Sequence, residues 1–309
     1  QLDYPYKVDY SKLTPSEPNF ANPSKPVEVF RYEELKSYLE EKKSTRVKVM
    51  NDIDFPTSES AARITIPAGF DKELDLNENT LKAGNKGQFE VQGNYFKMQN
   101  GHIIGGYGDD STRVPAENER NGLVYAPKEV ASKALENDIV FENIEHRNSN
   151  TSKTGKGGFI TVNSSNIFFT KDNKLTNGNY NIKGGSVTFM DGTFTGTVTR
   201  ETSSSLGWDN YGDGTDNIGY FGYGTTRKRA ISNQYIGDKR VTVLEDAEVE
   251  LYNLNKQGDK AYNNCIANFS TITVDGSLKL HSSYTPIRTI ISEVHSDDKS
   301  KPEEYWYKE

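Results

Sequence analysis

The chain has 309 residues, 33% of them hydrophobic and 26% charged, and this composition is typical of a folded protein and excludes a disordered polymer. It holds no apolar run near the roughly 18–20 residues of a membrane-spanning helix, so membrane insertion is not expected. The 44 acidic residues outnumber the 37 basic ones, but protonation of carboxyl groups near pH ~4 would make the surface positive. Binding of polyanions is therefore expected to strengthen in acid.

The first 43 residues predict an extended segment followed by a helix. Residues 1–26 contain prolines at positions 5, 15, 18, 23 and 26, which is typical of a lead-in or linker on the surface. Within residues 30–43, Tyr32, Leu35 and Leu39 share one face at helical spacing. An amphipathic helix here is expected to cover the open end of a β-structure.

The stretch from Arg63 to Gly106 predicts short strands separated by turns rich in Gly and Asn. The expected strands are Arg63–Ile66, Glu73–Leu76, Gln88–Val91, Tyr95–Met98 and His102–Ile104. Strands this short, with turn residues suited to left-handed backbone, favour a parallel β-solenoid whose inward apolar side chains form ladders. A β-sandwich is the alternative, because it also has regularly spaced short strands.

The order of elements in the first 110 residues resembles a known family. After the predicted helix come a strand at Arg46–Met50, a turn at Asn51–Asp54, and then Ile64–Ile66, Leu74–Leu81 and Phe96–Gly106. This pattern is similar to the pectate-lyase-like adhesive domains of Gram-positive surface proteins, and the size is similar to the binding regions of serine-rich repeat adhesins of lactic-acid bacteria. The resemblance implies an all-β fold, a right-handed parallel β-helix with an N-terminal capping α-helix, that binds host or plant carbohydrate in acid.

The expected organisation and function follow from this resemblance. We expect a lead-in over residues 1–26 and a single binding domain over residues 27–309. The domain is expected to be secreted to the bacterial cell surface or cell wall, with its signal peptide and anchor outside this fragment. We expect a monomeric adhesin that binds acidic polysaccharides or mucin-type and epithelial glycoproteins, with no cofactor and no catalysis. Weak, charge-driven binding of DNA at low pH is a further expectation.

The rest of the chain alternates between strands and polar segments. Strands are expected at Ile139–Phe141, Phe159–Val162, Asn166–Phe169, Ser186–Phe189, Val241–Leu244, Ile272–Val274 and Ser277–Leu280. Residues 107–127 predict a long loop, and loops that leave a rigid scaffold often carry binding residues. Residues 128–137 are compatible with either a short helix or an extended corner.

An aromatic and basic stretch between residues 205 and 229 gives the strongest indication of a binding site. Aromatic rings can stack on the C–H faces of sugars, and arginine can pair with a uronic carboxylate or a sulfate. With two arginines of the preceding long loop, the candidate ligand-binding residues are Trp208, Tyr211, Tyr220, Tyr223, Arg227, Lys228, Arg229, Arg113 and Arg120. The alternative for the aromatic residues is a lid that packs on the strands.

A polysaccharide lyase or glycoside hydrolase acting on pectin-like polyuronates is the alternative function. The resemblance to pectate lyases implies an Arg-x-Pro-x-x-Arg element, which Arg113-Val114-Pro115 meets only in part because the next arginine is Arg120. Asp109-Asp110 could form the carboxyl pair of a hydrolase, but a solvated turn explains this pair better. We therefore expect no catalytic residue.

Calcium and thiol chemistry have weaker support. Asp209, Asp213 and Asp216 lack the alternate spacing of an EF-hand loop, so Asp-Gly turns are favoured over a Ca²⁺ site. Cys265 is the single cysteine and is followed by Ile266, which predicts a buried and inert thiol.

A structural solenoid that forms a trimer is a third possible class of function.

Overall fold

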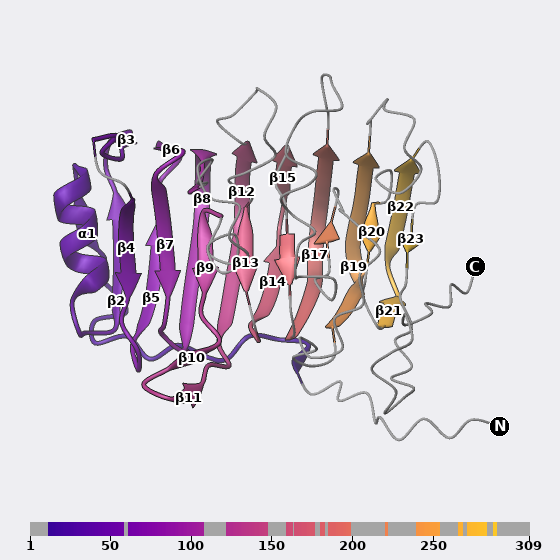
Figure 1. Ribbon diagram of the computed structural model, residues 1–309, viewed down its shortest axis with the longest axis horizontal. Coiled ribbons are helices and arrows are strands. Elements are labelled where there is room, and N and C mark those ends of the chain that lie inside the picture. The colour runs from indigo at the N-terminus through magenta and orange to yellow at the C-terminus, as the bar shows by residue number, and fades with distance from the viewer. Residues whose placement is uncertain are drawn as a thin grey trace, which may run out of the picture.

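The protein is mostly β-strand, with a single helix in the part of the chain that is described. The computed structural model describes residues 12–58, 61–107, 122–147, 159–162, 164–176, 180–182, 185–198, 220–221, 239–253, 265–267, 271–282 and 287–288. Its strands follow one another in sequence order along the longest axis, from helix α1 at one end to the last strands at the other (Figure 1). The all-β prediction is therefore confirmed.

Most strands belong to two parallel sheets. The 13-stranded sheet contains β1 (Val27–Val29), β2 (Thr45–Val49), β3 (Ile53–Asp54), β5 (Asp71–Asp75), β6 (Thr80–Gly84), β8 (Tyr95–Gly105), β12 (Asp138–Arg147), β14 (Asn166–Thr170), β15 (Asn173–Thr176), β17 (Gly185–Val198), β19 (Lys239–Asn253), β21 (Thr271–Val274) and β22 (Ser277–Ser282). The five-stranded sheet contains β4 (Ala62–Ile66), β7 (Gly87–Val91), β9 (Val124–Ala126), β13 (Ile160–Val162) and β16 (Tyr180–Ile182). The remaining strands are β10 (Glu129–Val130), β11 (Lys133–Ala134), β18 (Tyr220–Phe221), β20 (Ile266–Ala267) and β23 (Ile287–Arg288).

The long strands of the larger sheet bend midway along their length. In β8 and β12 the bend lies at Asn100 and Asn143, whose φ angles are 58° and 54°. The two residues lie side by side, between the register pairs Gln99–Glu142 and Gly101–Ile144. The first segments pair with β5 and β14, and the second segments pair with β6 and β15. The prediction of separate strands on either side of Asn100-Gly101 is therefore wrong, because one left-handed residue bends a strand without ending its pairing.

The inward side chains form apolar ladders across the parallel strands. One ladder follows the register through Val47, Leu74, Met98, Phe141, Phe169, Phe189 and Val243. All seven are buried, and the ring centroids lie 5.4 Å apart for Phe141–Phe169 and 5.3 Å for Phe169–Phe189. The predicted ladders are present, and the stacked rings show how each strand buries apolar surface against the next.

Helix α1 (Tyr32–Glu40) covers the N-terminal end of the sheets, which confirms the predicted position but shortens the range of 30–43. Leu35 and Leu39 are fully buried. The helix ends because Glu41 takes an extended backbone. Lys72 Nζ lies 2.8 Å from the Tyr38 carbonyl oxygen and donates a hydrogen bond to the last turn, while burial lowers the pKa of Lys72 to about 8. No helix in the described residues is long and apolar enough to cross a membrane.

Residues 12–26 lie against the outside of the larger sheet. Ser16 donates hydrogen bonds from its backbone N–H and its hydroxyl to Asp138 Oδ2, both at 2.7 Å, and the Asn19 backbone N–H lies 3.0 Å from Asp71 Oδ2. Phe20 packs on a small outer apolar cluster that includes Phe168. This segment of the chain is therefore attached along its length, at strands far from it in sequence.

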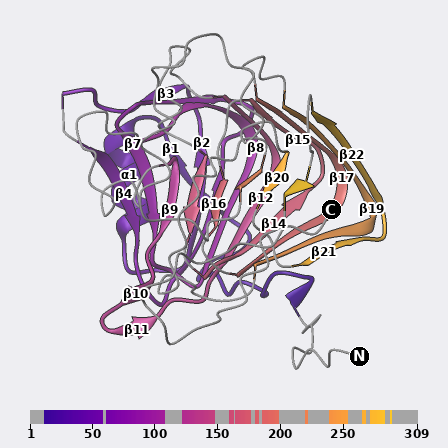
Figure 2. The same ribbon diagram turned by 45° about the vertical axis from the view of Figure 1, so that its right-hand side comes forward.

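The segment of residues 128–137, which the sequence predicted to be either a short helix or an extended corner, contains a small hairpin. Strands β10 and β11 pair antiparallel around the two residues Ala131 and Ser132, whose φ angles are 49° and 62°. Two consecutive left-handed residues are characteristic of a type I′ turn, which usually contains Asn-Gly. The hairpin projects from the strands at the lower edge in Figures 1 and 2.

Candidate functional site

The sequence-predicted binding residues lie almost entirely outside the described part of the chain. The candidate binding residues outside the described part are Arg113, Arg120, Trp208, Tyr211, Tyr223, Arg227, Lys228 and Arg229. The acidic residues considered for catalysis or calcium also lie outside it: Asp109, Asp110, Asp209, Asp213 and Asp216. The backbone of Tyr220 is placed in β18, which pairs antiparallel with β20. These assignments stay predictions. Cys265 is buried as predicted, with Sγ 3.3 Å from the His281 carbonyl oxygen.

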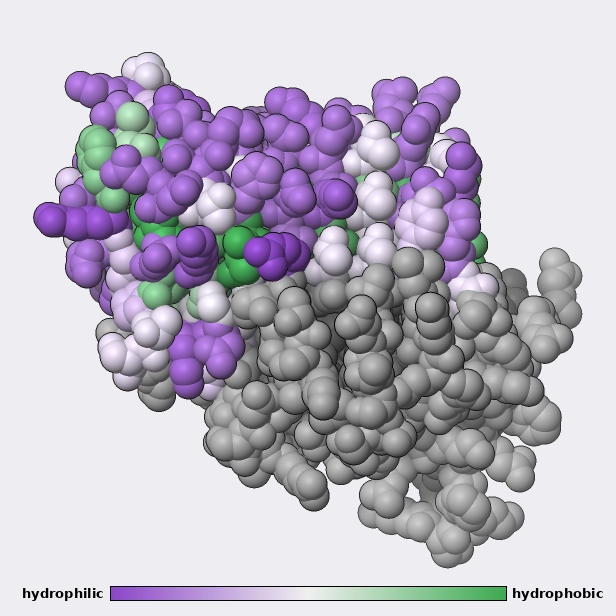
Figure 3. All heavy atoms as spheres, turned by 90° about the horizontal axis from the view of Figure 1, so that it is seen from above, coloured by the Kyte–Doolittle hydropathy of each residue, from purple (hydrophilic) through white to green (hydrophobic). Residues whose placement is uncertain are grey.

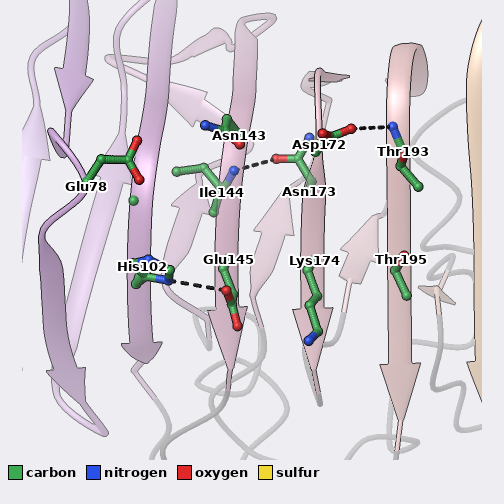
Figure 4. A pocket seen from close by; sticks show the side chains of 11 residues that line it. Glu78, His102, Asn143, Ile144, Glu145, Asp172, Asn173, Lys174, Thr193 and Thr195 are labelled. Atoms are coloured by element: carbon green, nitrogen blue, oxygen red, sulfur yellow. Dashed lines mark hydrogen bonds and ion pairs between the residues drawn. The ribbon is translucent and has the colours of Figure 1, made fainter.

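A shallow groove crosses the outer face of the larger sheet, over the second segments of its strands. Its volume is about 280 Å³. The residues that line it are Glu78, Gly101, His102, Asn143, Ile144, Glu145, Asp172, Asn173, Lys174, Thr193 and Thr195. They come from β8, β12, β15, β17 and the turns beside them, so the groove runs across strands rather than along one (Figure 4). Seen from above, the described surface of the protein is largely hydrophilic (Figure 3).

One row of the groove places side chains of different charge in register. His102, Glu145, Lys174 and Thr195 are successive register partners on four neighbouring strands, and they lie in one row in Figure 4. His102 Nδ1 lies 3.3 Å from Glu145 Oε2, and these side chains are 48% and 51% exposed. An exposed pair of this kind contributes at most about 1 kcal/mol to stability. The row is therefore open to a ligand without a large loss of internal interactions.

A second row of the groove is held by hydrogen bonds within the bend. Asp172 Oδ1 accepts from the Thr193 backbone N–H at 2.9 Å. Asn173 Oδ1 accepts from the Ile144 N–H at 3.0 Å, and Asn173 Nδ2 donates to the Thr170 carbonyl at 3.0 Å. Asn173 is only 3% exposed. This row fixes the backbone of the groove and leaves the first row to make outward contacts.

Replacing Asn173 with alanine is expected to destabilise the fold by about 2 kcal/mol, because it leaves the buried N–H of Ile144 without its acceptor. Thr193→Ala, which shortens an exposed side chain of the same row and leaves its backbone bond to Asp172 in place, is the matched control, with little expected loss. Urea denaturation at neutral pH measures both variants. An alanine variant as stable as the parent would contradict the role of Asn173 in the bend.

Further along the same face, three side chains of β19 and β22 form a second cluster. The rings of Tyr252 and His281 are stacked, with centroids 4.3 Å apart and planes 5° apart. His281 Nε2 lies 2.8 Å from Glu250 Oε1. Hydrogen bonds from Tyr252 and from His281 lower the pKa of Glu250, and the bond to Glu250 raises the pKa of Tyr252. The three groups hold one another in place on the surface.

The chemistry available in the groove is mainly hydrogen bonding and charge pairing. Glu78, Glu145 and Asp172 bring three carboxylates to it, yet no group of three or more His, Cys, Asp or Glu among the described residues is arranged to hold a metal ion. Comparison of the chain with protein-family models, curated proteins and solved structures finds no match. Any functional proposal for this chain therefore rests on the residues and geometry of the groove.

Sequence reasoning missed the groove for a specific reason. Strands β6 and β15 were not predicted, because Thr80–Gly84 and Asn173–Thr176 mix polar and apolar residues over four or five positions. The outward residues of β15 include Lys174, which becomes part of a row only when the register with β12 and β17 is known. Period-2 alternation after Asn173 was the only available indication.

Proposed function

We propose that this chain is the binding domain of a bacterial surface adhesin, folded as a right-handed parallel β-helix, that binds acidic polysaccharides or host glycoproteins without catalysis. The parallel register of both sheets and the apolar ladders support the β-helix, since each strand stacks on the one before it. The observation that carries the function is the row of His102, Glu145, Lys174 and Thr195, which offers donors and acceptors along an open groove.

The groove composition supports binding that is favoured by acid. At neutral pH its three carboxylates, Glu78, Glu145 and Asp172, oppose a polyanion. Acidic residues outnumber basic ones in the whole chain, so its net negative charge falls in acid and an anionic ligand of Lys174 meets less overall repulsion. The aromatic and basic residues between Trp208 and Arg229 belong to the same proposal as further contacts. Secretion to the cell wall and a monomeric state also belong to it.

Binding of the purified domain to polygalacturonate at pH 4 and pH 7 tests this function. We expect binding at pH 4 to be at least tenfold tighter, because the net negative charge of the protein is smaller there. Lys174→Gln should weaken binding at pH 4 about threefold, as expected for one exposed charge. Lys42→Gln, which removes an exposed lysine beside α1, is the matched control and should bind as the parent does.

The same mixtures distinguish the adhesin from an enzyme. Unsaturated or reducing ends that appear only with Ca²⁺ would overturn the adhesin in favour of a polysaccharide lyase, and the carboxylates of the groove would become the candidates for the metal site. No binding at either pH, with the fold intact by circular dichroism, would also overturn it. Binding in acid without product supports it.

A further inference from the structure

Another row of outward residues lies two positions further along the strands than the row of His102 and Glu145. In this row, short side chains stand between long ones. Its members are successive register partners on β12, β15, β17, β19 and β22, namely Arg147, Thr176, Thr197, Tyr252 and His281. Two short side chains, Thr176 and Thr197, thus stand between two long ones. Three steps of ~4.8 Å between strands separate Arg147 from Tyr252, which is about 14 Å at the level of the backbone.

We call the part of this row between Arg147 and Tyr252 the trough, and the residues along it are threonines. Thr176 and Thr197 are half-buried, and Thr195, in the neighbouring row of the groove, is also half-buried. Their hydroxyl groups can donate and accept hydrogen bonds, and their side chains are shorter than those of Arg147 and Tyr252. A sugar ring with several hydroxyl groups suits such a row better than a flat apolar ligand does.

The wall at the C-terminal side is an aromatic ring that the structure holds in place. His281 on β22 covers one face of Tyr252, so the other face of the Tyr252 ring is on the side of Thr197, its register partner on β17. Glu250 accepts a hydrogen bond from His281 and one from Tyr252. A ring fixed in advance loses little conformational freedom when a ligand stacks on it.

The opposite wall carries positive charge. Arg147 is exposed at the end of β12, and Lys174 is exposed in the neighbouring row on β15. A guanidinium group can bind a carboxylate through two parallel hydrogen bonds. The trough therefore presents an aromatic face at one side, hydroxyl groups below and a cation at the other side.

We propose that this trough is a subsite for one uronic acid residue of a polyanionic polysaccharide, with the C–H face of the sugar on Tyr252 and its carboxylate toward Arg147. This subsite rests on the proposed function, and it names the class of sugar that the same face of the sheet selects. None of the aromatic or basic residues singled out from the sequence belongs to it. It lies beside the groove, and Thr195 and Lys174 are common to both.

Titration calorimetry with galacturonic acid oligomers and with their methyl esters, in acid buffer, tests the subsite. Tyr252→Ala should weaken binding of both ligands about five- to tenfold, because the stacking face is lost. Tyr252→Phe should restore most of that binding. Arg147→Gln should weaken binding of the acid oligomers about fivefold and leave the methyl esters unchanged, because the ester removes the charge that arginine recognises. Tyr38→Ala removes an exposed tyrosine on α1 and is the control.

The outcomes separate the subsite from the proposed function. If the parent binds the acid oligomers while Tyr252→Ala and Arg147→Gln, both folded by circular dichroism, bind as tightly as the parent, the subsite is overturned and the function stands. A loss for Arg147→Gln alone also overturns it, since stacking then plays no part. A parent that binds neither ligand overturns both proposals.

Discussion

Replacing His146 with leucine is expected to reduce the loss of stability between pH 7 and pH 4. His146 is fully buried on β12 and occupies one rung of an aliphatic ladder, between Ile103 and Leu175. Its Nε2 lies 2.8 Å from the Gly105 carbonyl oxygen, and its Nδ1 has no hydrogen-bond partner. Burial lowers the pKa of His146 from 6.5 to about 4, and the bond to Gly105 opposes that shift only in part.

The sign of the effect follows from the order of the two pKa values. Above pH 6.5 the ring is neutral in both the folded and the unfolded chain, and it contributes no pH dependence. Between pH 6.5 and pH 4 the unfolded chain takes up a proton that the folded chain excludes, so the free energy of unfolding falls as the pH falls. Over that interval the loss amounts to about 3 kcal/mol.

Urea denaturation at pH 7 and pH 4 measures this difference. The parent should lose about 3 kcal/mol more than His146→Leu between the two pH values. At pH 7 the variant should be about 1 kcal/mol less stable, because the Gly105 carbonyl loses a donor. His102→Leu, which replaces a half-exposed histidine of the neighbouring row, is the comparison for removing an imidazole from the surface. Equal losses for the parent and His146→Leu would show that the buried ring does not govern acid stability.

This buried histidine sets a limit on binding in acid. Under the proposed function, polyanion binding strengthens as the pH falls, whereas the core becomes less stable over the same range. Binding should therefore rise to a maximum and then decline where unfolding begins. His146→Leu should move that decline to lower pH without changing the affinity of the folded domain, because His146 does not reach the outer surface.

The sequence predicted the parts of the fold that depend on local periodicity. The face of Tyr32, Leu35 and Leu39 identified α1, and alternating β-branched residues identified strands such as Arg46–Met50. The hairpin at Ala131-Ser132 could not be predicted, because neither residue favours the left-handed backbone that both adopt. Its conformation is set by the surrounding structure rather than by the two residues themselves.

The candidate site was beyond the reach of the sequence for a different reason. Rows such as His102, Glu145, Lys174 and Thr195 join residues that lie 21 to 43 positions apart, so no window along the chain contains them. His146 likewise appears polar in sequence, and only its register with Ile103 and Leu175 places it inside. Register between parallel strands is a tertiary property, and the varying number of residues between paired strands conceals it in the sequence.

Replacing Gly105 with alanine is expected to destabilise the fold by about 4 kcal/mol. Gly105 has a φ of 95°, and a Cβ atom there would overlap the carbonyl oxygen of Gly84 on the neighbouring strand. Gly69 has a φ of 82° but open space around the same position. Gly69→Ala therefore measures the backbone strain alone and should cost about 1 kcal/mol. Similar losses for the two variants in urea denaturation would contradict a close approach of β6 and β8.

The two large effects should also be coupled, because the Gly105 carbonyl is the hydrogen-bond acceptor of His146. An alanine at position 105 must push β8 away from Gly84, and this movement displaces the acceptor as well. In a chain that already carries His146→Leu, no such bond remains to be lost, so Gly105→Ala should cost about 1 kcal/mol less than it does in the parent. Additive losses in the double variant would mean that the bend at Gly105 and the buried histidine act independently.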